Sequence, residues 1–142
     1  MNRTAEPADG PWVERTLAAM SAEEKAGQLV MVAFFGLDPS GLPAVLERIK
    51  RYHLGGYFQV KNDLAALRDC NEVIQKEAKV PLLAASDFEA GVGYILSGGS
   101  LFPRQMARGA AGDAKAEYEI GRITAVEGRA AGINMTASPV LD

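Results

Sequence analysis

The sequence has one cysteine, Cys70, and one histidine, His53. A single cysteine excludes an internal disulfide, and one cysteine with one histidine cannot supply the four ligands of a structural zinc site. No apolar run approaches the roughly 18–20 residues that span a bilayer. The first ten residues are polar and lack the apolar core of a secretory signal. We therefore expect no metal, no cofactor and no membrane partner, and a cytoplasmic location.

The sequence also lacks an excess of basic charge. Its net charge is -3, with a pI of about 5.2. A mildly acidic surface gives no electrostatic attraction for nucleic acid or anionic membranes, so neither is expected as a partner. The hydrophobic fraction of 48% and the charged fraction of 23% are those of a globular protein, and 142 residues suffice for one domain.

Apolar periodicity and capping residues predict helices that alternate with strands. Ser21, Asp63 and Asp113 each stand where a helix N-cap is wanted, and Glu24 completes a capping box with Ser21. Gly132 suits the left-handed residue at the end of the last helix. The expected helices cover residues 12–19, 22–28, 43–52, a segment after Asp63, and 114–131. The expected strands cover residues 29–35, 57–60, 80–85 and 133–137, and a glycine-rich loop spans residues 91–103.

The same periodicity predicts which side chains are buried. The short apolar strand 29–35 is expected to be buried. In the helix after Asp63, the side chains of Leu64, Leu67, Val73 and Ile74 are expected to face inward, with Cys70 as a small packing residue. Glu127 lies on the apolar stripe of the last helix, so we expect it to be partly buried, to have a hydrogen-bond donor and to act structurally.

Strands that alternate with helices indicate an α/β fold with a parallel sheet. About four strands are present, which fits either a small doubly wound sheet or the N-terminal half of an eight-stranded (β/α)8 barrel of the TIM type. Periodicity does not separate the two. A chain that stops directly after a strand leaves a sheet edge unprotected, which favours a piece of something larger.

Ligands of parallel α/β folds bind at the C-terminal ends of the strands. Four positions qualify, of which residues 86–93 are the most unusual: an apolar strand delivers Asp87 and Glu89 directly to a glycine-rich loop. A carboxylate there can accept hydrogen bonds from hydroxyl groups, and the glycines allow a ligand to approach the backbone. The alternative is that Asp87 only caps the loop. The other three positions are residues 35–36, 59–62 and 138–142.

Gly91 and Gly93 after a strand raise the possibility of a dinucleotide site. Leu96 occupies the place of the third glycine, however, and Asp87 and Glu89 would repel a pyrophosphate. The pattern therefore does not favour this class of ligand.

Five segments, in order and at about the expected spacing, resemble the N-terminal barrel domain of glycoside hydrolase family 3. They resemble the family patterns M-(T/S)-x-E-E-K-x-G-Q-L, D-x-E-G-G, G-G-T-x-F-P, E-x-R-A-x-G-I-N and x-A-P-V-L-D. The segments in this sequence are Met20–Leu29, Ser86–Gly91, Gly98–Pro103, Glu127–Asn134 and Ala137–Asp142. Residues 1–19 are expected to form a flexible lead-in, to about residue 10, and a short helix. The resemblance indicates a partial family 3 domain, truncated at its C-terminus, over residues 20–142.

The resemblance implies a retaining hydrolase that releases sugars from the non-reducing ends of β-linked glycosides, of β-glucosidase or β-N-acetylhexosaminidase type. Asp87 matches the aspartate that binds sugar hydroxyls in this family. Glu89, Gly91 and Asp142 are expected to support the same site. The family's nucleophile, acid/base and Lys-His pair would lie beyond residue 142, with the rest of the barrel. No catalytic residue is therefore assigned here, and the isolated chain is expected to be inactive.

The sequence departs from the family pattern at several residues, of which Ser100 in place of threonine is a mild change. Ala90 replaces the first glycine of D-x-E-G-G, where a methyl group would narrow the loop or demand a different backbone angle. Val92 and Ile95 are apolar where members of the family often carry an arginine. These departures leave open which sugar is bound and whether the full protein is active. They keep a non-catalytic sugar-binding or scaffold protein as the alternative function.

Overall fold

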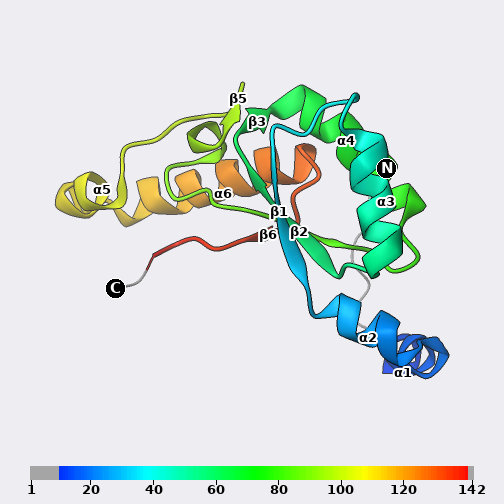
Figure 1. The fold of residues 1–142 in the computed structure, drawn as a ribbon. Coiled ribbons are helices and arrows are strands. Elements are labelled where there is room, and N and C mark those ends of the chain that lie inside the picture. Colours follow the sequence, from blue (N-terminus) through cyan, green and yellow to red (C-terminus); the bar gives the residue numbers. More distant parts are fainter. Residues whose placement is uncertain (1–9, 141–142) are drawn as a thin grey trace.

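A computed structural model describes residues 10–140 (Figure 1). The flexible lead-in predicted to about residue 10 therefore lies almost entirely outside the described residues. Six α-helices and six strands are described, with one short 3-10 helix, η1. The helices are α1 (Gly10–Ala19), α2 (Ala22–Gln28), α3 (Leu42–Tyr52), α4 (Leu64–Glu77), α5 (Gln105–Ala111) and α6 (Ala114–Ala130), and η1 covers Val92–Tyr94. The strands are β1 (Met31–Phe35), β2 (Gly56–Val60), β3 (Asn62–Asp63), β4 (Leu83–Ser86), β5 (Leu96–Ser97) and β6 (Met135–Thr136).

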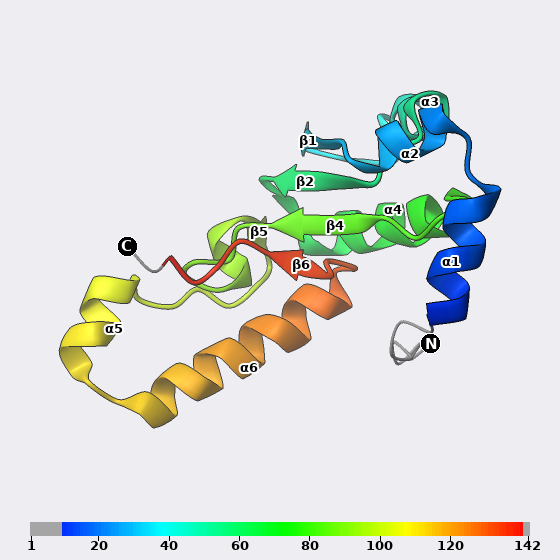
Figure 2. The ribbon, with the colours of Figure 1, turned by 90° about the horizontal axis from the view of Figure 1, so that it is seen from below.

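The main sheet is parallel and its strand order is β1-β2-β4-β6. Each new strand is added beside the preceding one, so the sheet grows in a single direction (Figure 2). A doubly wound sheet instead reverses its strand order at a switch point. The observed order is that of four successive strands of a (β/α)8 barrel, which confirms the predicted half-barrel and decides between the two alternatives.

One face of this sheet packs against helices and forms the core. Phe34 and Tyr57 point to that side, with ring centroids 5.6 Å apart, and they pack with Leu67 and Ile74 of α4. Figure 2 shows α4 behind β2 and β4. Within residues 10–140, no helix is long and apolar enough to cross a membrane.

The opposite face of the sheet is open, and this corrects the expectation that residues 29–35 are buried. The strand begins only at Met31, Leu29 is 90% exposed and Phe35 is 75% exposed. β1 forms one edge of the sheet, and the described residues cover only the face that carries Phe34. An apolar run predicts burial only where both faces of a strand are covered.

The inward face of α4 also differs from the prediction. Leu67, Cys70 and Ile74 are buried as expected, but Val73 is 39% exposed and Asn71 takes the inward position. Tyr57 donates a hydrogen bond from its hydroxyl to Asn71 Oδ1, and Asn71 Nδ2 donates to the carbonyl of Ala131 at 2.8 Å. Positions 67, 70, 71 and 74 form one helical stripe, so Asn71 faces inward, where its amide group finds partners.

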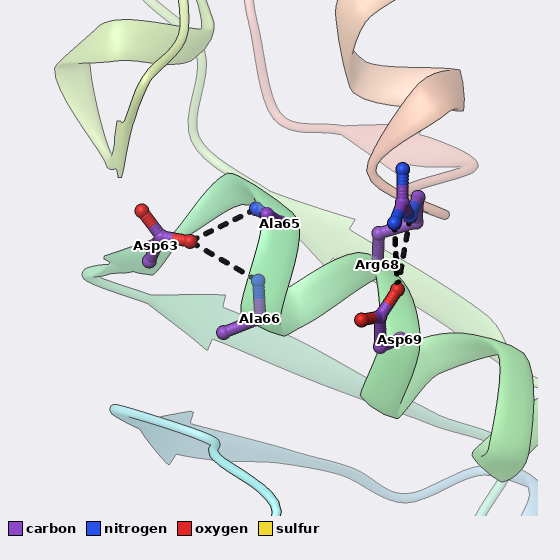
Figure 3. A network of polar contacts seen from close by, with 5 residues as sticks. All are labelled: Asp63, Ala65, Ala66, Arg68 and Asp69. Atoms are coloured by element: carbon purple, nitrogen blue, oxygen red, sulfur yellow. Dashed lines mark hydrogen bonds and ion pairs between the residues drawn. The ribbon is translucent and has the colours of Figure 1, made fainter.

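The predicted caps are confirmed. Ser21 and Glu24 form the reciprocal capping box of α2. Asp63 accepts hydrogen bonds from the backbone amides of Ala65 and Ala66 at the start of α4 (Figure 3). Asp113 caps α6 in the same way, and Gly132 has the expected positive φ of 82°. The side chains of Ser21, Asp63 and Asp113 fix where their helices begin.

Several boundaries differ from the prediction. β4 starts at Leu83 rather than at residue 80 because both backbone groups of Leu82 are taken by side chains: its amide donates to Gln75 Oε1 and its carbonyl accepts from Gln75 Nε2. β6 covers only residues 135–136 of the predicted 133–137. The loop 91–103 contains η1 and β5, and β5 pairs with β3. Helix α5 was not predicted.

Candidate functional site

The four predicted ligand positions meet in neighbouring pairs at the C-terminal edge of the sheet. Gln59 and Ser86 are partners in the register of β2 and β4, and Ser86 pairs with Thr136 of β6. Residues 35–36 join the end of β2 because the amide of Gly36 donates to the carbonyl of Lys61 at 3.2 Å. Residues 86–87 contact the segment after β6, since the Ser138 hydroxyl donates a hydrogen bond to Asp87. The alternation of strands and helices therefore predicted this edge correctly.

Asp87 follows β4 directly and is half-buried. Ser138, two residues beyond β6, donates a hydrogen bond from its hydroxyl to Asp87 Oδ1 at 3.3 Å. Among the described residues no backbone amide donates to this carboxylate, so the alternative that Asp87 caps its own loop has no support. The carboxylate keeps capacity to accept further hydrogen bonds from a bound hydroxyl group.

Glu89 follows the buried Phe88 and borders a cavity of about 440 Å³ that is lined by residues of α5, α6 and β6. Arg108, Glu117 and Ser138 also line this cavity, whereas Asp87 does not. Asp87 therefore binds Ser138 without lining this cavity, whereas Glu89 is one of the cavity's lining residues. Asp142, the remaining predicted position, lies outside the described residues.

Gly91 is required by the path of the loop. Its φ is +87°, and a Cβ atom there would lie 2.5 Å from the carbonyl oxygen of Ser100 and 2.6 Å from the ring of Phe102. The two limbs of the loop run this closely because the amide of Gly93 donates to Ser100 and the amide of Phe102 donates to Ala90, both at 2.8 Å. Gly91 therefore shapes the site and offers no side chain to a ligand.

Ala90 fits the loop without strain. It is buried, and the only residues other than glycine with positive φ in the described chain are His53 and Lys61. The methyl group therefore occupies a conformation that any residue adopts, and the concern that it demands a special backbone angle is removed.

Glu127 ties this loop to α6. Its Oε2 accepts from the backbone amide of Ser100 at 2.8 Å, and its Oε1 accepts from the Ser100 hydroxyl at 2.6 Å. The expectation that a half-buried Glu127 has a hydrogen-bond donor is confirmed.

Arg108 is the residue near this site that sequence reasoning missed. Its guanidinium donates to the carbonyl of Glu89 at 3.3 Å and lies 3.5 Å from the carboxylate of Glu117. Its side chain is only 11% exposed, and no described residue accepts from its Nε. Val92, one of the two positions at which members of the family often carry an arginine, is fully buried. Arg108 lies on α5. Because that helix was not predicted, no feature of the sequence indicated that Arg108 would lie near this site.

Two other buried groups have raised pKa values. Burial raises the pKa of the Cys70 thiol, which favours its neutral form. Burial also raises the pKa of Tyr57 above its usual range. Within residues 10–140, no three His, Cys, Asp or Glu side chains converge as metal ligands would. At this edge the Ser138 hydroxyl donates a hydrogen bond to the Asp87 carboxylate.

Comparison with known proteins identifies the family of this chain. A sequence model described as "Glycosyl hydrolase family 3 N terminal domain" matches residues 21–142. The chain belongs to glycosyl hydrolase family 3. This confirms the resemblance of the five segments, and it places Asp87 and Glu127 within the matched residues of a family 3 N-terminal domain.

Relatives of this family 3 domain are enzymes of β-linked sugars. A "beta-N-acetylglucosaminidase/beta-glucosidase" of Cellulomonas fimi is 30% identical over 131 residues, which are 92% of this chain and 23% of that protein. A "periplasmic beta-glucosidase" of Salmonella typhimurium is 28% identical over 133 residues, 92% of this chain and 16% of that protein.

The solved structures agree. A "beta-glucoside phosphorylase BglX bound to 2FGlc" matches with a TM-score of 0.84 and 29% identity, over 93% of this chain and 24% of that chain. The domain thus spans less than a quarter of the length of each of these relatives.

Proposed function

We propose that this family 3 domain supplies sugar-binding residues to a retaining β-glycosidase that acts at non-reducing ends, of β-glucosidase or β-N-acetylhexosaminidase type. The observation that carries the proposal is Asp87: a half-buried carboxylate at the C-terminal edge of a parallel sheet, with Ser138 as its only hydrogen-bond partner among the described residues. The printed activities of the relatives, which concern β-glucosides and N-acetylglucosaminides, fit the same class of substrate.

In this proposal Asp87 accepts hydrogen bonds from hydroxyl groups of the terminal sugar, where a charged acceptor forms stronger bonds than a neutral one. Ser138 holds one oxygen of Asp87 and so orients the other. Gly91 shapes the loop behind Asp87, and Glu89 holds the helix side of that loop, where its carbonyl accepts from Arg108.

The nucleophile and the acid/base are proposed to lie outside these 142 residues. A retaining mechanism needs two carboxyl groups roughly 5–5.5 Å apart on either side of the scissile bond. Asp87 binds Ser138, and Glu89 borders a cavity that Asp87 does not line, so we assign neither residue as a member of such a pair. A polypeptide of these 142 residues alone is therefore proposed to be inactive.

An assay of p-nitrophenol release tests this proposal. The natural gene product that carries these residues is offered p-nitrophenyl β-D-glucoside and p-nitrophenyl N-acetyl-β-D-glucosaminide, and the 142-residue polypeptide is assayed beside it. We expect release by the gene product on at least one substrate and none by the polypeptide. Turnover by the polypeptide would contradict the assignment of catalysis to other residues. Binding of glucose without release by the gene product would support the alternative, a non-catalytic sugar-binding protein.

Phosphorolysis is the second candidate reaction because two of the matching solved structures are of a β-glucoside phosphorylase. Hydrolysis and phosphorolysis break the same glycosidic bond, and they differ in whether water or phosphate takes the sugar. The same assay with added inorganic phosphate distinguishes them, since only phosphorolysis yields a sugar 1-phosphate and accelerates with phosphate.

A further inference from the structure

Helix α6 holds the loop of residues 86–103 at two adjacent residues. Gly128 packs on the ring of Phe88: a Cβ atom there would lie 3.0 Å from Phe88 Cε2. Glu127 binds Ser100 through both of its carboxylate oxygens. The first contact fixes the limb that carries Asp87 and Glu89, and the second fixes the returning limb.

The two limbs are joined to each other by backbone hydrogen bonds. Ser100, which Glu127 holds, accepts from the amide of Gly93, and Phe102 donates to the carbonyl of Ala90. Ala90 is three residues from Asp87, and the intervening Phe88 is buried. These two hydrogen bonds, each 2.8 Å long, connect the returning limb to the segment that carries Asp87, so a displacement of Ser100 is expected to move that segment as well.

We infer that Glu127 is a positioning residue for the sugar site: it fixes Ser100, and through the joined limbs it sets the place of the Asp87 carboxylate. This inference rests on the proposed role of Asp87 in sugar binding. Glu127 itself lies on the helix side of the loop and binds only Ser100 among the described residues, so it acts on the sugar through Asp87.

The charge of Glu127 matters for this role. Hydrogen bonds to a carboxylate are shorter and stronger than neutral ones. Glutamine at this position keeps an oxygen for the Ser100 amide and an amide group for its hydroxyl, so it retains the geometry with weaker bonds. Alanine removes both bonds. The order of effects expected from positioning is therefore Glu127→Ala larger than Glu127→Gln, with partial rescue by glutamine.

A double-mutant cycle in the natural gene product tests the inference. The affinity for glucose and for N-acetylglucosamine is measured by calorimetric titration for the unchanged protein, Glu127→Ala, Glu127→Gln, Asp87→Asn and the double variant Glu127→Ala/Asp87→Asn. We expect Glu127→Ala to weaken sugar binding about tenfold and Glu127→Gln less. In the Asp87→Asn background, Glu127→Ala should have no further effect, because its influence passes through Asp87.

Two results would overturn the inference while leaving the proposed function standing. One is that Asp87→Asn weakens binding and Glu127→Ala does not. The other is that Glu127→Ala weakens binding by the same factor in both backgrounds. If Asp87→Asn itself leaves affinity unchanged, the proposed function is wrong, and the inference that rests on it falls with it.

Two further measurements guard against a variant that fails to fold. Ser100→Ala removes only the hydroxyl bond to Glu127 and keeps the amide bond, so a smaller loss of affinity than for Glu127→Ala is expected. Hydrogen exchange of peptides that cover residues 90–102 should be faster in Glu127→Ala than in the unchanged protein. Glu119→Gln, on the same helix and exposed, is the matched control and should change neither quantity. Unchanged exchange in a folded Glu127→Ala variant would overturn the inference.

Discussion

Both carboxylate oxygens of Glu127 accept hydrogen bonds from one residue, Ser100, which lies 27 positions earlier in the chain. The two residues belong to different segments of the family pattern, one on α6 and one on the glycine-rich loop. Their contact explains why a charged residue stands on an apolar helical stripe, since the loop supplies the donors that a half-buried carboxylate needs.

Removal of this contact should destabilise the fold. Glu127→Ala deletes two charge-assisted hydrogen bonds and leaves the Ser100 amide without its acceptor, so we expect the free energy of unfolding to fall by about 2 kcal/mol. Denaturant titration of the natural gene product measures the loss. Glu119→Gln, whose partner is the exposed Arg122, should change the free energy by less than about 0.5 kcal/mol. Equal effects of the two substitutions would argue against the importance of the Ser100 contact.

The loop should tolerate no side chain at Gly91. Gly91→Ala places a methyl group 2.5 Å from the Ser100 carbonyl oxygen at a φ of +87°, and we expect a loss of about 1–3 kcal/mol from strain, with more from the contact. Gly109→Ala is the matched control, because a Cβ atom in that part of α5 meets nothing within 4 Å. It should be neutral or stabilise by up to about 1 kcal/mol. Thermal melts of both variants give the comparison, and a stable Gly91→Ala variant would refute the described loop path.

The buried hydroxyl of Tyr57 should contribute to the free energy of unfolding. Tyr57→Phe keeps the ring and leaves Asn71 Oδ1 without its donor in the core, which should cost about 1–3 kcal/mol. Tyr52→Phe, at an exposed tyrosine on α3, is the control and should have almost no effect. Denaturant titration measures the free energy of unfolding of both variants. Equal losses for Tyr57→Phe and Tyr52→Phe would contradict this account of the core.

The cap of α4 should make stability depend on pH. The amide of Ala66 and the Ser97 hydroxyl donate to Asp63 and hold its pKa below the ordinary value of about 3.9. A carboxyl whose pKa is lower in the folded state contributes stability above its unfolded pKa, and this contribution is lost as the pH falls through the folded pKa. Asp63→Asn lacks the charge, so the stability gap between unchanged protein and variant should begin to close below about pH 5 and go on closing as the pH falls through the folded pKa. A gap that stays constant over this fall in pH would contradict the assignment.

The parts of the structure that follow from short-range chemistry could be predicted from the sequence. Asp63 and Asp113 cap their helices because an N-cap involves residues only two or three positions apart. The inward place of Glu127 followed from helical periodicity. The partner of Glu127 could not be predicted in the same way, because Ser100 is brought to it by the packing of the loop on α6.

The same distinction explains what was missed. Arg108 reaches Glu89 from a helix with no strong cap or apolar stripe, and Asn71 is accommodated inside only because Tyr57 and Ala131 meet it there. The exposure of Phe35 depends on which elements cover the second face of the sheet. These features are decided by tertiary contacts, which local periodicity does not contain.

The central claim is that Asp87 binds the sugar, and its substitution in the natural gene product tests this most directly. Asp87→Asn keeps the size of the side chain and removes the charged acceptor, so kcat/KM for the preferred p-nitrophenyl β-glycoside should fall about 100-fold or more with an unchanged thermal melt. Asp69→Asn, at an exposed aspartate that pairs with Arg68, is the control and should retain full activity. An Asp87→Asn protein that is folded and as active as the unchanged enzyme would contradict the account.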